Sequence, residues 1–147
     1  MKAQLAEQLQ TLARQRRDQA RAASMRADQI LRDGCAQLNS LQEYQRESRQ
    51  KQMRSGRLGS SVDQIALHHH FDANLDKVIH EQKSRVERLQ QSSVQAMGRL
   101  RLAQVTLAAY EALITRWQQL AAKGQQRREQ KGNDEIAARV HANRLGA

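Results

Sequence analysis

The segment Ser55-Gly56-Arg57-Leu58-Gly59-Ser60-Ser61 decides the fold, because it is the only place in this chain of 147 residues where two glycines and three serines cluster. Such a cluster is typical of a turn. Ser61 followed by Gln64 is typical of a capping box, in which each side chain bonds the other residue's backbone N–H. Asp63 suits the positive N-terminus of a helix. We therefore predict that one helix ends and another begins here.

The sequence on both sides of this turn favours long helices. The chain has no proline, and aromatic residues make up only 3% of it. Proline would break a helix, and a chain rich in Ala, Leu, Arg, Gln, Glu and Lys is typical of coiled coils. We predict one domain over 1–147, with a first helix at about 2–54, a turn at 55–60 and a second helix at about 61–123 that continues more weakly to about 144.

A heptad pattern supports the second helix. Steps of alternately four and three residues from Leu75 to Ala121 fall on apolar residues at roughly twelve of fourteen positions, as expected for a coiled-coil seam. These positions are Leu75, Ile79, Gln82, Val86, Leu89, Ser93, Ala96, Leu100, Ala103, Leu107, Tyr110, Ile114, Trp117 and Ala121.

The first helix carries a less regular row, with a stutter around Arg16. Its positions are Leu5, Leu9, Leu12, Arg16, Ala20, Ser24, Ala27, Leu31, Gly34, Leu38, Leu41 and Gln45. If the chain folds back near residue 58, the numbers of facing residues add up to about 116. Weak positions, which are seam positions without a large apolar side chain, then face each other, as Gly34 faces Gln82. The match favours an all-α, monomeric, antiparallel two-helix coiled-coil hairpin. A dimer of long helices is the alternative.

The same arithmetic leaves the C-terminal part of the second helix without a partner. Residue 1 would lie opposite about residue 115, although the apolar row continues through Trp117 and Leu120. An unpaired helix that exposes such side chains is typical of a binding face. The predicted hairpin therefore has a protruding C-terminal helix.

No set of residues predicts catalysis or a cofactor. Adjacent side chains on a helix point about 100° apart, so the run His68–His70 cannot converge on one metal ion. Asp72 and Asp76 are interpreted as part of a solvated face, because a two-helix hairpin offers no cleft for acid–base chemistry. We predict that the chain is not an enzyme and binds no metal or cofactor.

The charge predicts an acidic partner. The formal net charge is +10, and basic residues gather at Arg14, Arg16 and Arg17 and again at Arg127, Arg128 and Lys131. Docking of this basic end into an acidic protein cavity is the favoured interpretation. Nucleic-acid binding is an alternative, weakened by the scarcity of aromatic residues for base stacking. The third interpretation is that these basic residues belong to the ordinary solvated exterior of a coiled coil.

A second candidate surface lies near the turn. Phe71, Leu75, Val78 and Gln82 follow helical spacing, and a comparable row on the first helix consists of Gln37, Leu41, Tyr44 and Ser48. These residues either thicken the core or form a partner site. The pairing of the only Phe with a Tyr favours the partner site.

Three segments resemble those of a known family. Cys35-Ala36-Gln37-Leu38-Asn39-Ser40-Leu41-Gln42-Glu43-Tyr44-Gln45-Arg46-Glu47 and the stretch from Phe71 to Gln82 are similar to the FliJ family of flagellar export proteins, and Arg127–Glu135 is similar to that family's closing segment. The resemblance covers nearly the whole chain. It implies a cytoplasmic component of the flagellar type III export apparatus, similar to the stalk subunit of rotary ATPases and peripheral on the inner membrane through protein partners. An injectisome stalk homologue is the alternative machine.

The resemblance also implies partners and sites. The termini would enter the central hole of a hexameric export ATPase and promote ring assembly, and the rod would contact a transmembrane export-gate protein and escort export chaperones. The implied gate-binding residues are Gln37, Leu41, Tyr44, Phe71, Leu75, Val78 and Gln82. The expected ATPase-ring residues are Leu5, Arg14, Arg16, Arg17, Ile114, Trp117, Leu120, Arg127 and Arg128.

Overall fold

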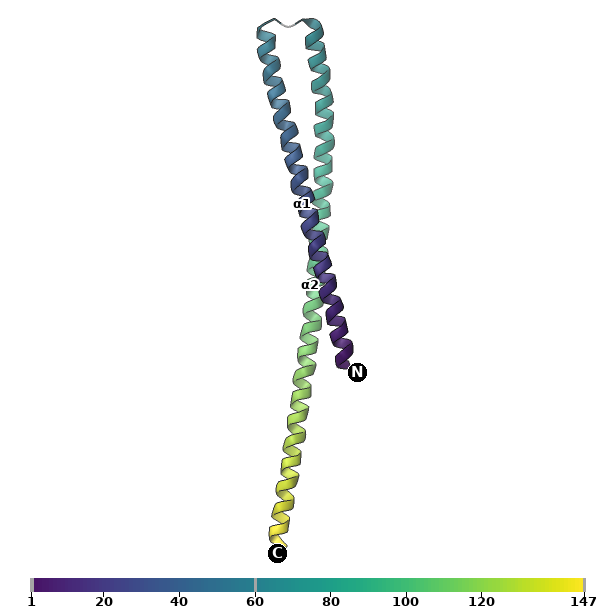
Figure 1. The fold of residues 1–147 in the computed structure, drawn as a ribbon, viewed down its shortest axis with the longest axis vertical. Helices are drawn as coiled ribbons and strands as arrows, with labels where there is room; N and C mark the ends of the chain where they lie inside the picture. Colours follow the sequence, from purple (N-terminus) through teal and green to yellow (C-terminus); the bar gives the residue numbers. More distant parts are fainter. Residues whose placement is uncertain (1, 60, 147) are drawn as a thin grey trace. The chain divides into compact units, whose positions relative to one another are not determined.

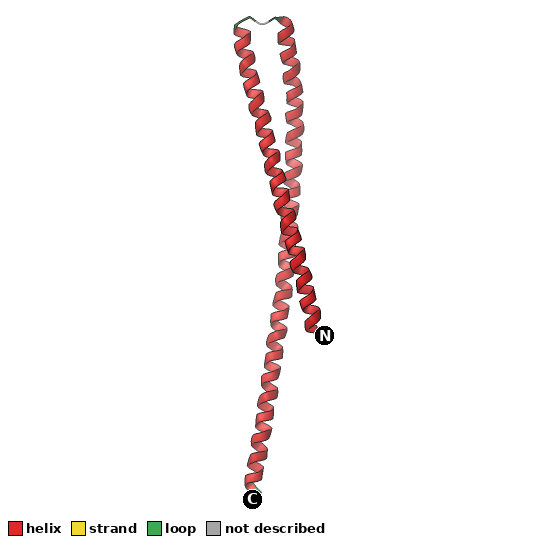
Figure 2. Cartoon of the chain, viewed as in Figure 1, coloured by secondary structure: helices red, strands yellow, loops and turns green. Residues whose placement is uncertain are grey.

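A computed structural model describes residues 2–59 and 61–146. They form two helices, α1 (Lys2–Arg57) and α2 (Val62–Leu145), joined by one short loop (Figures 1 and 2). These described residues include no strand. The predicted all-α helical hairpin is confirmed.

The chain divides into two compact units. Asp18–Leu102 form one, which contains the loop and is called the turn unit here. Met1–Arg17 and Ala103–Ala147 form the other, called the terminal unit because it contains both ends of the chain. Each predicted partner surface falls inside one unit, so each is described by itself.

The loop is shorter than the sequence predicts. α1 continues to Arg57, so Gly56 is helical, and the turn closes with a hydrogen bond from the Leu58 N–H to the Ser55 carbonyl at 3.1 Å. Gly59 adopts φ of +86°, the left-handed conformation that glycine enters without a steric penalty and that commonly ends a helix.

The predicted capping box is present at the start of α2. The Gln64 N–H donates to Ser61 Oγ, and the Ser61 N–H donates to Gln64 Oε1, each at 3.3 Å. These bonds satisfy two donors that a helix N-terminus otherwise leaves unpaired.

The predicted seam is confirmed over most of its length. Every predicted seam position of α2 from Leu75 to Ile114 is buried or half-buried, with Leu75, Ile79 and Leu107 the most enclosed. On α1 the same holds from Ala20 to Gln45. Trp117 and Ala121, the last two positions of the α2 row, are exposed.

The start of α1 differs from the prediction. Ala6 and Ala13 are buried, whereas Leu5 is 57% exposed and Leu12 is 43% exposed. The seam therefore has no stutter at Arg16, which is exposed. Alanines in the seam let another helix approach closely, and this small-residue row is easily overlooked beside a row of leucines.

The register also differs from the prediction. In the turn unit Gln45 bonds Asp76, Arg49 bonds Asp72 and Gln52 bonds the carbonyl of His68, so the numbers of these partners total 120 or 121 rather than about 116. Facing residues thus lie about one helical turn further along α2.

One predicted weak layer is present and tightly packed. Gln82 Nε2 donates to the Gly34 carbonyl at 3.0 Å and to Gln37 Oε1 at 3.4 Å. A Cβ atom on Gly34 would lie 2.9 Å from Leu89 Cδ1 and 3.7 Å from Val86 Cγ2. The absence of a side chain at position 34 therefore permits the close approach of the two helices.

Two glycine substitutions in the turn unit should have opposite effects. Gly98→Ala is expected to raise the free energy of unfolding by about 0.5–1 kcal/mol, because nothing lies within 4 Å of an added Cβ and alanine favours the helix. Gly34→Val is expected to lower it by about 1–3 kcal/mol through overpacking against Leu89 and Val86. Urea unfolding followed by circular dichroism measures both. Stabilisation by both substitutions would contradict the close approach at Gly34.

Candidate partner-binding surfaces

An exposed aromatic pair lies on the turn unit. The rings of Tyr44 on α1 and Phe71 on α2 lie 6.2 Å apart at 74°, an edge-to-face arrangement. Tyr44 is 55% exposed, Phe71 is 41% exposed, and Val78 is also exposed. These three predicted gate-binding residues offer apolar surface to a partner, and the contact between the two rings holds them in place.

Of the other four predicted gate-binding residues, Gln37 is exposed and three lie deeper. Leu75 is buried in the seam and Leu41 is half-buried. Gln82 is occupied by its bonds to Gly34 and Gln37, and Gln37, Leu41 and Gln82 line one shallow hollow. Leu75 and Gln82 therefore have evident roles in packing the two helices together.

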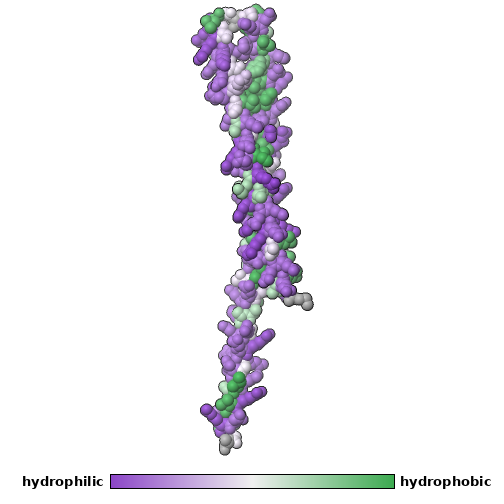
Figure 3. All heavy atoms as spheres, in the orientation of Figure 1, coloured by the Kyte–Doolittle hydropathy of each residue, from purple (hydrophilic) through white to green (hydrophobic). Residues whose placement is uncertain are grey.

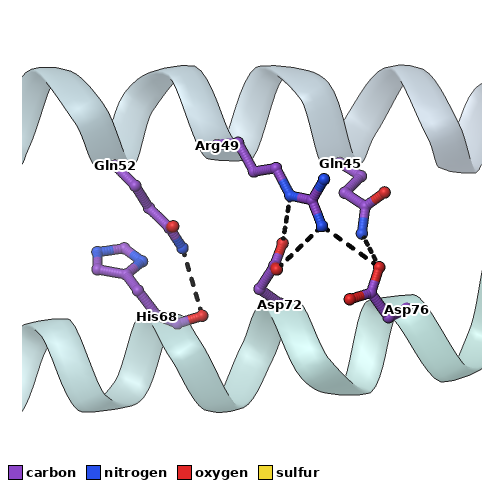
Figure 4. A network of polar contacts seen from close by, with 6 residues as sticks. All are labelled: Gln45, Arg49, Gln52, His68, Asp72 and Asp76. Atoms are coloured by element: carbon purple, nitrogen blue, oxygen red, sulfur yellow. Dashed lines mark hydrogen bonds and ion pairs between the residues drawn. The ribbon is translucent and has the colours of Figure 1, made fainter.

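A polar network joins α1 to α2 beside the aromatic pair (Figure 4). Arg49 Nε lies 3.0 Å from Asp72 Oδ1, and Arg49 Nη2 lies 3.2 Å from Asp72 Oδ2 and 3.4 Å from Asp76 Oδ1. The hydrogen bond to Asp72 raises the pKa of the Arg49 guanidinium; desolvation partly opposes this rise, and the charges of Asp72 and Asp76 add to it. Asp72 and Asp76, predicted to belong to a solvated face, therefore bind the opposite helix.

The heptad pattern does not predict this network, because the network depends on the register of α1 against α2. With facing residues that total about 116, Arg49 lies opposite Leu67, and Asp72 lies more than one helical turn further along α2. A shift of one helical turn brings the guanidinium to Asp72. A search for opposite charges across the turn, made at several registers, could have found it.

In the terminal unit a groove lies between the first turns of α1 and the stretch of α2 from Ile114 to Ala121. It has a volume of about 420 Å³ and is lined by Lys2, Ala3, Ala6, Glu7, Ile114, Trp117, Gln118, Leu120 and Ala121. Trp117 is 39% exposed. Trp117 lines this groove together with Ala3 and Ala6 of α1. The prediction that Trp117 lies beyond the end of α1 is therefore wrong. Leu5 is exposed outside the groove.

The predicted basic residues form no single cluster. Arg14 Nη2 lies 3.9 Å from Glu111 Oε1, a weak ion pair, and Arg16 is exposed. Arg17 is half-buried. Arg127 and Arg128 are exposed and lie four turns or more beyond Glu111 on α2, about 24 Å at 1.5 Å per residue.

α2 continues beyond the groove to Leu145 as an unbroken helix (Figure 1). From residue 122 onward every described residue except Gly124 and Gly132 is exposed, including Ile136 at 61% and Val140 at 47%. Figure 3 shows a patch of hydrophobic atoms near the C-terminal end of the chain, among hydrophilic ones. The part of the helix after about residue 123, which was predicted to be weaker, continues without a break through Gly124 and Gly132. The protruding C-terminal helix is present, although it begins later than predicted.

Among residues 2–59 and 61–146, no group of three or more His, Cys, Asp or Glu side chains is placed to hold a metal ion. None of the helices within these residues has an apolar stretch long enough to cross a membrane.

Comparison with known proteins identifies the family. The family model described as "Flagellar FliJ protein" matches residues 1–146. No curated protein and no solved structure matches the chain. Because the match covers nearly the whole chain and agrees with two long helices, the chain belongs to the FliJ family and is a component of the flagellar export apparatus.

Proposed function

We propose that the chain is a stalk-like assembly factor of the export apparatus. Its terminal unit enters the central hole of the hexameric export ATPase and promotes ring assembly, and its turn unit contacts the transmembrane export-gate protein. The observation that carries this proposal is the stretch of α2 from residue 122 to Leu145, where exposed apolar side chains have no α1 beside them.

A helix of this kind needs a host. Most helical stability in proteins comes from the packing of an apolar face, and an isolated helix of this length is marginal in water. Ile136 and Val140 are spaced four residues apart, so they lie on one face of the helix. A surrounding ring would cover that face and stabilise the helix.

The charge of this stretch indicates the kind of host. Residues 122–145 contain six basic residues (Lys123, Arg127, Arg128, Lys131, Arg139 and Arg144) and three acidic ones (Glu129, Asp134 and Glu135). The excess of positive charge favours a bore lined by acidic residues.

The groove around Trp117 supplies a second contact inside the ring. Its lining is mostly apolar, and Trp117 and Leu120 stay partly exposed in it. A bulky apolar side chain from the ATPase would fill the groove and displace water from Trp117, a residue type that often dominates binding energy. Ile114 and Leu120 would enclose that side chain.

The turn unit supports contact with the gate. Tyr44, Phe71 and Val78 are exposed apolar residues, while Arg49, Asp72 and Asp76 hold the two helices at fixed spacing beside them. A rigid aromatic pair loses little conformational freedom on binding. Through its partners the chain would work in the cytoplasm at the inner membrane, where it could also escort export chaperones.

Imaging of the purified ATPase with the full chain tests the proposal. The expected result is that the chain raises the number of hexameric rings and that density fills their central hole. Rings that form equally well without the chain, or whose holes stay empty with the chain bound elsewhere, would contradict it.

A further inference from the structure

We propose that the loop end of the turn unit binds an anionic lipid surface directly. Apolar side chains around the loop enter the membrane interface, and Lys51, Arg54 and Arg57 contact the headgroups. This contact goes beyond the proposed function, because neither the ATPase nor the gate takes part in it.

The first observation is the exposure of apolar side chains at the loop. Leu58, in the turn, is 88% exposed, and Val62, the first residue of α2, is 81% exposed. They are the two most exposed large hydrophobic residues among those described. Met53, Ile65 and Leu67 lie within a few residues and are exposed as well. A turn that faces water needs no apolar side chains, so the fold does not explain why these five exposed residues are apolar.

The second observation is unbalanced positive charge at the same end. Lys51, Arg54 and Arg57 are exposed and form no ion pair with another described residue. Asp63 is the only acidic residue between positions 48 and 71. Arg49 is occupied by Asp72 and Asp76, so it does not belong to the lipid-binding set.

Together the two observations match a lipid surface. Apolar side chains beside Lys and Arg are the combination with which peripheral segments bind anionic membranes. A stable protein interface covers about 800 Å² on each partner with a packed apolar centre. The loop end has no such packed centre, since polar side chains such as Gln52, His68 and Asp72 line the hollow beside it together with Met53 and Ile65.

Flotation with vesicles measures the binding. The full chain should bind vesicles of phosphatidylcholine with phosphatidylglycerol and bind pure phosphatidylcholine far more weakly. A basic side chain near an anionic surface contributes about fivefold, so Lys51→Gln, Arg54→Gln and Arg57→Gln together should weaken binding about 100-fold. Leu58→Ser with Val62→Ser should weaken it about tenfold or more.

A matched control separates a local site from general attraction by a basic protein. Arg127→Gln, Arg128→Gln and Lys131→Gln remove the same charge from the terminal unit and should change binding less than about threefold. An equal loss in both triple variants would overturn the proposal. Absence of binding to the anionic vesicles would also overturn the proposal, even if the loop-end residues bound an acidic protein instead.

Tryptophan fluorescence locates the contact. Trp117 is the only tryptophan and lies in the terminal unit, so its emission should not change when vesicles bind. In a Trp117→Phe, Leu58→Trp chain, the emission should shift to the blue with anionic vesicles and be quenched by brominated lipid. A blue shift of Trp117 itself, or none at position 58, would contradict insertion of the loop end.

Discussion

A chain that stops after Ala121 is expected to lose all stimulation of the export ATPase. The truncation removes the part of α2 that has no α1 beside it, including Ile136 and Val140 and the excess of basic residues. It keeps the seam from Leu75 to Ile114 and the groove around Trp117. ATP hydrolysis measured against concentration of the chain should remain at the level of the ATPase alone.

The controls distinguish loss of a binding segment from loss of folding. The truncated chain should keep its midpoint of unfolding within a few degrees, since no buried residue is removed. Ile136→Ala with Val140→Ala in the full chain should lower the stimulation at least about tenfold, while Gly132→Ala should not. Full stimulation by the truncated chain would refute the stalk function of this segment.

Phe71→Ala combined with Tyr44→Ala is expected to weaken binding to the export gate about 30-fold. Aromatic residues that are partly exposed and held by a neighbour are typical hot spots, where truncation costs 2 kcal/mol or more. Titration calorimetry with the soluble part of the gate protein measures the change. Stimulation of the ATPase should be unaffected, because both residues lie in the turn unit.

Met25 provides the matched control for the gate surface. It is 68% exposed on α1 of the same unit but lies far from the aromatic pair in sequence. Met25→Ala should leave gate binding within about twofold. If Met25→Ala and the double aromatic variant had equal effects, the aromatic pair would not be the gate site.

The sequence predicts much of this fold because the fold depends on local patterns. The capping box at Ser61 and Gln64 is a contact between residues three apart. The α2 seam follows from its heptad spacing. The layer of Gly34 and Gln82 was found by comparing weak positions on the two rows. The first two required no knowledge of the loop geometry, and the third required only an approximate position for the turn.

The register was predicted poorly because it depends on where α1 ends. A helix that continues to Arg57 moves the point of reversal toward α2. That shift brings Arg49 to Asp72 and brings Trp117 into a groove with Ala6. The buried alanines at positions 6 and 13 were missed for a different reason, since periodicity analysis gives more weight to leucine than to alanine.

For the predicted site residues, the structure gives their exposure and their contacts within the chain. Tyr44 and Phe71 are exposed and in contact, as a partner site requires. Leu75 and Gln82 proved to be packing residues, because helical spacing alone does not tell the seam from the face beside it. The identity of the partners stays a proposal from the family.

Photo-crosslinking from position 136 tests most directly whether the exposed end of α2 has a host. A photoreactive side chain in place of Ile136 is expected to capture the export ATPase in high yield, and only when the ATPase is present. Capture of the chain's own α1, or of the gate protein in preference to the ATPase, would contradict the account.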